Sequence, residues 1–311
     1  MIEIESATKL YGNVIGINDI TLQIPAGAYG LLGPNGSGKT TLLNLLTGQL
    51  RPTLGRVRIF DQNPWRNNQL LKLLGLCPAG EVYLPNVSAL DWVTYLVELH
   101  GFGQKEAAQR AEEALCRVGL QDAMRRKIGN YSLGMRQRTK LAQSIAHDPQ
   151  LLILDEPFNG LDPIARYEMT RLLLDWIDDG RSLIIASHIL HEVEAITPDF
   201  LLIRGGRLLA SGSSQEIHRM LAETPNELTI CSSDPRRVAT RLLELPAVKS
   251  IRFSASEGTM TCAVDNARAV CELLPEWTRE TGVEIYEIRS PEDSLQALFN
   301  ALMRMHRGEL K

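Results

Sequence analysis

The first two thirds of the chain are organised by short apolar runs that alternate with longer stretches of helical periodicity. Compact runs rich in Val, Ile and Leu, bounded by Gly, Pro and polar residues, are typical of strands. We expect strands over residues 2–10, 14–24, 28–32, 151–154, 182–186 and 200–203. The first two alternate loosely and end at the turn Pro25-Ala26-Gly27, which indicates edge strands. The later runs are apolar throughout and favour the interior of a parallel sheet.

Helical periodicity fills the intervals between these strands. Apolar residues at spacings of three and four predict helices over residues 39–47, 91–99, 104–118, 135–146 and 164–176. Three of them fall within a predicted helical subdomain at about residues 86–148. The alternation of strands and helices predicts an α/β fold in which helices cover a mostly parallel sheet.

The pattern changes near residue 220, where a second, smaller domain is expected. Strands are predicted over residues 228–232, 248–254, 259–264 and 283–288, and helices over residues 235–243, 267–279 and 292–305. This order of elements indicates a small α+β sandwich. We therefore expect two domains, residues 1–219 and residues 220–311.

Composition and charge exclude several classes of protein. The 33 Lys and Arg against 37 Asp and Glu give a net charge of -4, so no electrostatic excess suggests binding to a nucleic-acid backbone or to anionic lipid. No run reaches the roughly 18 to 20 apolar residues of a membrane span, and the acidic start lacks the features of a signal peptide, so we expect a cytoplasmic chain. The cysteines are scattered and form no C-x-x-C pair, so reduced core residues are expected, with a redox or metal role as the alternative. They are Cys77, Cys116, Cys231, Cys262 and Cys271.

A glycine-rich segment between the predicted strand 28–32 and the following helix fits the phosphate-binding pattern G-x-x-x-x-G-K-[ST]. Glycines let successive backbone N–H groups turn inward, and the helix N-terminus adds partial positive charge, so main chain would hold a polyphosphate. Lys39 would reach the β and γ phosphates, and the Thr40 hydroxyl would ligate Mg²⁺. A plain glycine-rich turn is the alternative. The expected nucleotide-binding residues here are Gly33, Pro34, Asn35, Gly36, Ser37, Gly38, Lys39, Thr40 and Thr41.

Two carboxylates follow the apolar strand at residues 151–154. Ligands bind at the carboxyl ends of strands in open α/β sheets, so Asp155 and Glu156 would face the bound phosphates. Asp155 would hold Mg²⁺, and Glu156 would polarise the attacking water as general base. The alternative is an acidic turn without chemistry, which the neighbouring phosphate loop disfavours.

Three further segments carry a resemblance to a known family. Residues 131–138 read YSLGMRQR and open a predicted helix upstream of the carboxylate strand, residues 160–163 read GLDP, and residues 187–188 read SH. With the phosphate loop and the carboxylate strand, and in this order, they resemble the signature motif, D-loop and switch histidine of ABC-type ATPases. Roughly residues 1–215 look like an ABC nucleotide-binding domain, of the P-loop NTPase fold.

The resemblance implies a site shared between two chains. In this family two domains pair head to tail, and each ATP lies between the phosphate loop of one and the signature motif of the other. Ser132 and Gly134 would bind the γ-phosphate held by the partner, and Asp162 would align the two sites. His188 would contact the γ-phosphate and orient Glu156, and Tyr11 would stack on adenine.

Each of these residues also has a structural interpretation. Ser132 alone would more often be a helix N-cap, a histidine after a strand is usually structural, and Tyr11 could simply fill an edge strand. The complete set of motifs favours the functional roles.

Two departures from the family pattern change the expected chemistry. Leu133 stands where the signature usually has glycine, although Ser132 and Gly134 are retained. More important, Ala79 follows Pro78 where the family carries glutamine. Alanine can neither ligate Mg²⁺ nor hydrogen-bond the water, so the glutamine's contact is lost unless Glu81 supplies it. Slow or partner-dependent hydrolysis is therefore predicted. The neighbouring surface corresponds to the seat of a membrane subunit's coupling helix, with Tyr83, Leu84, Val87 and Trp92 as apolar candidates for contact or core.

The resemblance as a whole implies the ATP-hydrolysing subunit of an ABC transporter, most like exporter subunits whose membrane permease is a separate chain. The chain would form a homodimer and lie on the inner face of the cell membrane through that permease. The alternatives are a soluble ABC ATPase outside transport, or a weakly hydrolysing regulatory module that binds ATP. The second domain would serve dimerisation or partner contact.

Overall fold

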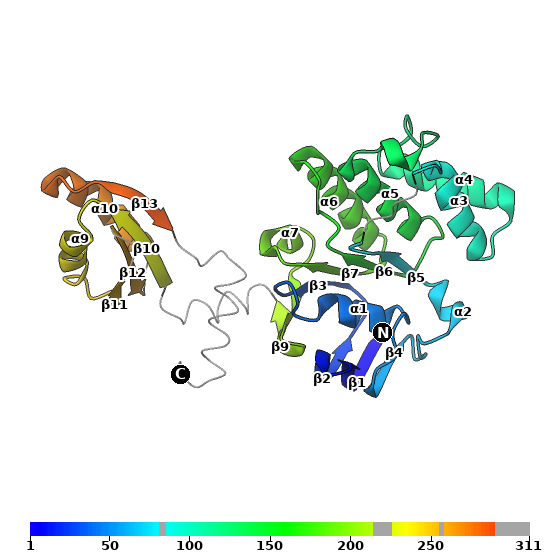
Figure 1. Ribbon diagram of the computed structural model, residues 1–311, viewed down its shortest axis with the longest axis horizontal. Helices are drawn as coiled ribbons and strands as arrows, with labels where there is room; N and C mark the ends of the chain where they lie inside the picture. The colour runs from blue at the N-terminus through cyan, green and yellow to red at the C-terminus, as the bar shows by residue number, and fades with distance from the viewer. Residues whose placement is uncertain (81–84, 214–225, 255–257, 266, 290–311) are drawn as a thin grey trace. The chain divides into compact units, whose positions relative to one another are not determined.

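A computed structural model of the chain describes residues 1–80, 85–213, 226–254, 258–265 and 267–289. The chain divides into two compact units, Met1–Ser213 and Ser214–Lys311 (Figure 1). The domain boundary predicted after residue 219 lies outside the described residues, as does the helix predicted over residues 292–305. Within the described part, no helix is long and apolar enough to cross a membrane.

The first unit is built on a six-stranded sheet. Its strands, in spatial order, are β5 (Leu74–Cys77), β6 (Leu151–Asp155), β7 (Ser182–Ser187), β3 (Ala28–Leu32), β8 (Asp199–Arg204) and β9 (Arg207–Ser213). Five of them are parallel, and β9 pairs antiparallel to β8. The central strands β6 and β7 are buried along their whole length, which explains their uninterrupted apolar sequence.

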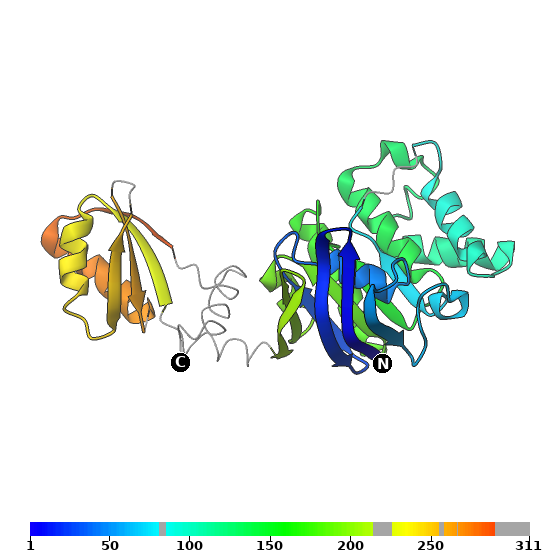
Figure 2. The ribbon, with the colours of Figure 1, turned by 60° about the horizontal axis from the view of Figure 1, so that its bottom comes forward.

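A second sheet of three antiparallel strands lies beside the first. Its order is β2 (Val14–Ile24), β1 (Ile2–Tyr11) and β4 (Leu54–Ile59) (Figure 2). The expectation that both N-terminal strands are edge strands is therefore wrong for β1, which lies between two neighbours. The strand β4 was missed because only Val57 and Ile59 of its residues are buried, so its sequence carries little apolar signal.

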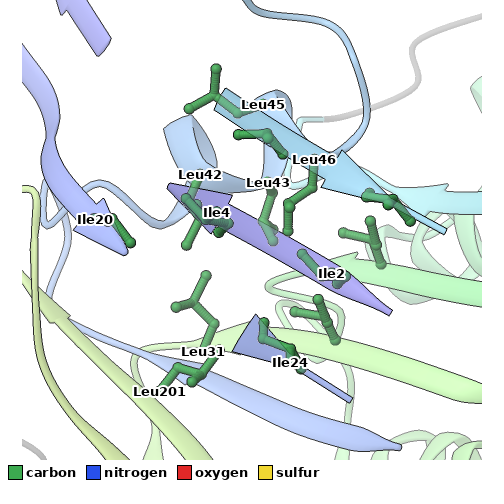
Figure 3. Close-up of a cluster of buried hydrophobic side chains, with 14 of the residues drawn as sticks. Ile2, Ile4, Ile20, Ile24, Leu31, Leu42, Leu43, Leu45, Leu46 and Leu201 are labelled. Atoms are coloured by element: carbon green, nitrogen blue, oxygen red, sulfur yellow. The ribbon is translucent and has the colours of Figure 1, made fainter. Parts of the chain in front are cut away.

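Helices cover both faces of the six-stranded sheet. Helix α1 (Lys39–Leu46) lies between the two sheets, while α5 (Leu133–Ile145) and α6 (Pro163–Asp178) lie on the other face (Figure 1). Four leucines of α1 pack against Ile2 and Ile4 of β1 and against Leu31 and Leu201 of the larger sheet (Figure 3). This core fixes the N-terminus of α1, and with it the phosphate loop, against the ends of β3 and β6. The leucines are Leu42, Leu43, Leu45 and Leu46.

The predicted helical subdomain is present. It contains α3 (Ala89–Leu99), α4 (Gln104–Arg117), a 3₁₀ turn (Ile128–Asn130) and α5. Two short helices were not predicted: α2 (Asn68–Leu71) and α7 (Leu190–Glu194). Both are shorter than two turns, so they carry too few residues for a periodic signal.

The second unit contains a four-stranded antiparallel sheet in the order β11 (Val248–Phe253), β12 (Thr259–Val264), β10 (Asn226–Ser232) and β13 (Ile285–Arg289). Helices α9 (Pro235–Leu242) and α10 (Ala267–Thr281) supply Val238, Leu242 and Leu274 to its core. The order of elements is the β-α-β-β-α-β pattern of ferredoxin-like domains, as the predicted α+β sandwich requires.

Candidate functional site

The phosphate loop joins β3 to α1 and has the backbone that its glycines permit. Gly36 and Gly38 both have positive φ, at 77° and 109°, and Gly38 is the N-cap of α1 without a side-chain cap. A Cβ on Gly38 would lie 2.6 Å from the carbonyl oxygen of Gly16, whereas a Cβ on Gly36 would meet no atom within 4 Å. Among the described residues, the buried Ser37 hydroxyl has no hydrogen-bond partner. The loop is thus a glycine cradle at a helix N-terminus whose first turn holds no acidic residue.

Lys39 begins α1 and is buried, with its side chain 6% exposed. Its Nζ donates a hydrogen bond to the Gly33 carbonyl oxygen at 2.7 Å and lies 3.3 Å from Oε1 of Glu156. That carboxylate oxygen accepts no hydrogen bond in the described chain. The ammonium therefore lies between the loop and the acidic end of β6, where a phosphate would find a positive charge beside backbone N–H donors.

Thr40 and Asp155 form the pair expected to hold a divalent cation. The Thr40 hydroxyl donates to Oδ2 of Asp155 at 2.8 Å, and Oδ1 of Asp155 is buried and has no hydrogen-bond partner in the part of the chain that the structure describes. Burial raises the pKa of Asp155, while the Thr40 hydrogen bond opposes this rise. Oxygen donors of this kind are the ligands that Mg²⁺ prefers, so an unpartnered carboxylate oxygen next to a hydroxyl fits Mg²⁺ bound together with phosphate.

Glu156 and His188 meet at the carboxyl ends of β6 and β7. The Nδ1 atom of His188 lies 2.8 Å from Oε2 of Glu156. An ionised carboxylate only accepts hydrogen bonds, so Nδ1 carries the proton and Nε2 is left for another partner. Glu156 has a positive φ of 52°, an uncommon conformation for a residue with a side chain, which turns the chain directly after β6. The structure thus joins Lys39, Glu156 and His188 in one cluster.

Tyr11 lies at the end of β1, next to the first turn of α1. Its hydroxyl is 3.4 Å from Oγ1 of Thr41, and its ring lies over Gly16, where a Cβ would come within 2.6 Å of Cε2. The side chain is 44% exposed. The ring is thus partly open to solvent beside the phosphate loop and is not an interior residue of the sheet.

The signature and D-loop residues form a second group. Ser132 is exposed and caps α5, with its hydroxyl accepting from the Met135 N–H at 3.2 Å. Asp162 caps α6 in the same way, accepting from Ala165 at 2.8 Å. Gly134 lies close to Gly160, because a Cβ on Gly134 would be 3.6 Å from the Gly160 carbonyl oxygen. In the described chain, neither Ser132 nor Asp162 forms a hydrogen bond or ion pair with the phosphate-loop cluster.

Leu133, the departure from the usual signature glycine, has a structural partner in this chain. Its side chain lies against Gly160, where a Cβ would come within 2.2 Å of Leu133 Cδ2. Gly160 has a positive φ of 75°. The leucine is therefore accommodated by a glycine in the D-loop segment, and the N-terminus of α5 remains open around Ser132.

Two buried polar residues of α5 were missed from the sequence. The Gln137 side-chain amide donates to the Pro157 carbonyl oxygen at 2.7 Å, directly after Glu156. Lys140 is 3% exposed, and its Nζ donates to the carbonyl oxygens of Pro78, Ala79 and Gly80 at 2.8, 3.3 and 3.1 Å. A signal existed, because residues 137, 140, 141 and 144 share one helix face and the face is buried.

Ala79, which stands where the family carries glutamine, lies in the segment directly after β5. The Ala79 residue is exposed, and its carbonyl oxygen is one of the three that Lys140 engages. The candidate residues Glu81, Tyr83 and Leu84 lie outside the described residues. Trp92 is partly buried, and its indole N–H donates to Gln143 at 2.8 Å, so this residue is anchored to α5.

The five cysteines are free, as expected. Cys77 and Cys262 are buried, and burial raises the pKa of Cys77 to about 12. Cys231 and Cys271 are partly buried, and Cys116 is exposed on α4, so its assignment to the core was wrong. The error has a simple cause. The apolar pattern around Cys116 predicts a helix, but it does not decide whether Cys116 lies on the buried or the exposed face, and cysteine occurs on both.

Comparisons with known proteins agree with the fold and the motifs. Residues 17–159 match the sequence profile of the ABC transporter family. The chain is 33% identical, over 97% of its length and 96% of the relative, to a bacitracin transport ATP-binding protein of Enterococcus faecalis. It is 30% identical, over 97% of its length and 92% of the relative, to a daunorubicin/doxorubicin resistance ATP-binding protein of Streptomyces peucetius.

Solved structures show the same fold. The ATP-binding subunit of an ABC transporter superposes with a TM-score of 0.65 at 22% identity, over 71% of this chain and 93% of that one. A dimeric bacterial ABC transporter cassette gives a TM-score of 0.64 at 23% identity, over 68% of this chain and 98% of that one. The resemblance stated from the motifs is thus confirmed, and this chain belongs to the family of ABC transporter ATP-binding subunits.

Proposed function

We propose that the chain binds Mg-ATP in its phosphate loop, closes head to tail on a second copy, and hydrolyses the ATP to drive a permease carried on a separate chain. Lys39 and the backbone N–H groups of the loop hold the β and γ phosphates, and Tyr11 stacks on the base. Glu156 acts as general base, and His188 orients it. Ser132, Gly134 and Asp162 act on the nucleotide held by the partner copy.

The observation that carries this proposal is the Lys39, Glu156 and His188 cluster. A carboxylate 3.3 Å from a buried ammonium and 2.8 Å from an imidazole is held at the carboxyl end of β6 next to the phosphate loop. A γ-phosphate would compete with Glu156 for the Lys39 ammonium, and this frees one carboxylate oxygen to accept a proton from water. His188 keeps the other oxygen fixed through Nδ1, which leaves Nε2 for the γ-phosphate.

Thr40 and Asp155 would hold Mg²⁺, which neutralises phosphate charge when bound. The support is the buried Asp155 oxygen, which has no partner within the described ranges, together with the adjacent Thr40 hydroxyl. The second Asp155 oxygen accepts the hydrogen bond from the Thr40 hydroxyl, so the two side chains lie side by side.

A second copy is supported by the surface around the signature motif. Three large apolar side chains are exposed there or at the start of α6: Leu133 is 44% exposed, Ile164 is 72% exposed and Tyr167 is 65% exposed. They accompany the exposed Ser132 and Asp162, which are already fixed by capping. Apolar groups next to ordered polar ones are typical of an interface that forms and opens.

Glu156→Gln tests the catalytic assignment. The amide cannot take a proton from water, so we expect phosphate release to fall by about 10²-fold or more. Nucleotide binding should persist, because the phosphate loop is unchanged, and an ATP-bound dimer should accumulate on gel filtration. Equal phosphate release by the variant and the parent would contradict the assignment.

Ala79 bears on the rate and on the alternative of a weakly hydrolysing regulatory module. Its methyl group offers no contact to metal or water, and its carbonyl oxygen is directed to Lys140. We propose that hydrolysis by the isolated subunit is slow for this reason. Ala79→Gln should raise the turnover rate at saturating Mg-ATP, and an unchanged or lower rate would count against the proposal.

The transport role rests on the named relatives, which are transport and drug-resistance ATP-binding proteins. We propose that the chain sits on the inner face of the cell membrane through an integral permease and does not bind nucleic acid. Val87 and Trp92 lie in the segment expected to meet it. The test is copurification from detergent-solubilised membranes: an integral protein should accompany the chain, and its consistent absence would leave only the ATPase part of the proposal.

We propose that the second unit serves dimerisation or contact with a partner. Truncation at about residue 220 that preserved this assembly would remove that role.

A further inference from the structure

Glu192, on the short helix α7, is a buried carboxylate that the site described above does not use. Its side chain is 4% exposed, and both oxygens are engaged. Oε1 lies 3.2 Å from Nη1 of Arg166, and Oε2 accepts a hydrogen bond from the Ser187 hydroxyl at 3.2 Å. A buried carboxylate is costly unless paired, so this double engagement points to a specific role in placing its partners.

The Ser187 hydroxyl connects Glu192 to the turn that carries His188. Ser187 is the last residue of β7, and its Oγ accepts a hydrogen bond from the Ile189 N–H at 3.0 Å while donating to Glu192. A serine that accepts from the backbone two residues later defines a local turn. His188 is the middle residue of that turn, and its Nδ1 is 2.8 Å from Glu156.

Through Arg166, Glu192 is connected to the D-loop segment, residues 160–163. Asp162 caps α6 through Ala165, and the Arg166 N–H donates to the Asp162 carbonyl oxygen at 2.9 Å. Arg166 therefore belongs to the first turn of the helix that Asp162 begins. Its guanidinium reaches across to α7, so the ion pair with Glu192 ties the start of α6 to the histidine turn.

We propose that Glu192 is a positioning residue for His188. Glu192 holds the turn at residues 187–189 through the Ser187 hydroxyl and, through Arg166, fixes that turn to the helix that follows the D-loop. This inference rests on the proposed role of His188 in hydrolysis. In this inference Glu192 orients His188, and the phosphate loop binds the nucleotide.

Because Glu192 orients His188 and does not bind nucleotide, its loss should affect kcat more than ATP affinity. Loss of Glu192 frees the Ser187 hydroxyl and the histidine turn, so kcat for ATP hydrolysis should fall about tenfold or more. ATP affinity should stay within about twofold of the parent, because Lys39 and the glycine cradle are untouched. Glu192→Gln keeps the size and one acceptor oxygen for Ser187 but loses the ion pair, and should retain an intermediate kcat.

The test compares Glu192→Ala, His188→Ala and the double variant in the full chain, with steady-state ATP hydrolysis and nucleotide binding measured on each. If Glu192 acts through His188, adding Glu192→Ala to His188→Ala lowers kcat no further. Glu168→Gln is the matched control, because Glu168 lies on α6 close to Arg166 and forms a 3.0 Å ion pair with Arg138 away from the turn. It should leave kcat unchanged. Urea midpoints check folding, and Glu192→Gln replaces Glu192→Ala throughout if the alanine variant does not fold.

The outcomes separate this inference from the proposed function. The positioning role alone would be overturned if Glu192→Ala lowered kcat in the His188→Ala background by the same factor as in the parent. Weakened ATP binding with unchanged kcat in Glu192→Ala would also overturn it. Wild-type kcat in Glu192→Ala beside a severely impaired His188→Ala would do the same. Wild-type kcat in His188→Ala would overturn both the proposed function of the histidine and the inference that rests on it.

Discussion

Two glycines of the phosphate loop allow a matched test of the cradle geometry. Gly36 and Gly38 both have positive φ, at 77° and 109°. They differ in what an added methyl group would meet: nothing within 4 Å at Gly36, but the Gly16 carbonyl oxygen at 2.6 Å at Gly38. Because that oxygen belongs to the backbone of β2, it cannot rotate away as a side chain would.

The magnitudes follow from these two geometries. A side chain in the left-handed region costs about 1–2 kcal/mol, so Gly36→Ala should lower the unfolding free energy by that amount. Gly38→Ala carries at least that strain, because its φ of 109° lies further from the left-handed region, and it also forces apart the loop and β2, which adds roughly 1–3 kcal/mol for overpacking. The difference between the two variants, at least about 1–3 kcal/mol, therefore reports the crowding at Gly38, where the Gly16 carbonyl oxygen is the nearest atom.

The assay is urea unfolding of the nucleotide-free protein followed by tryptophan fluorescence. Trp277 lies in the second unit and is replaced by Phe in all proteins, so that the signal reports the first unit, where Trp176 is buried. We expect a lower midpoint for Gly38→Ala than for Gly36→Ala. Equal midpoints would refute the close approach of the loop to β2.

The remaining predictions concern buried groups outside the glycine cradle. Lys140→Met removes the ammonium from three carbonyl oxygens and should lower the unfolding free energy by roughly 3 kcal/mol, whereas the exposed Lys105→Met should leave the urea midpoint unchanged. Iodoacetamide at about pH 8 should label the exposed Cys116 and spare the buried Cys77, whose pKa of about 12 keeps the thiol protonated, as peptide mass mapping would show. Burial lowers the pKa of His147 from 6.5 to about 4, so the folded state binds fewer protons than the unfolded chain between these values. The stability that neutral His147 provides is therefore complete above pH 6.5 and lost as the pH falls toward about 4, and His147→Gln should flatten the fall in urea midpoint over that interval.

The parts of the site that the sequence predicted are those fixed by local chain geometry. The phosphate loop depends on glycine positions within eight residues, and Asp155 and Glu156 depend on the end of one apolar strand. A strand that is buried on both sides leaves a continuous apolar run, so β3, β6 and β7 could be predicted as well. Their order in the sheet follows from long-range pairing, which no short pattern records.

The parts that the sequence could not predict depend on contacts between distant segments. The spacing along α5 indicates that Lys140 faces the interior, but its three partners are the carbonyl oxygens of Pro78, Ala79 and Gly80, which follow β5 about sixty residues earlier. Glu192 follows the histidine motif by four residues, but its role depends on Arg166 of another helix. The central position of β1 had the same cause, because β4 pairs with it from more than forty residues away.

The central claim is that each catalytic site combines the phosphate loop of one copy with the signature motif of another. Lys39→Ala disables the first half, and Ser132→Ala disables the second, so each purified variant should hydrolyse ATP at a small fraction of the parent rate. A mixed dimer contains one site with both halves intact, so an equimolar mixture should recover about one quarter of the parent rate. A mixture that hydrolyses ATP no faster than the two variants measured apart would contradict the shared site.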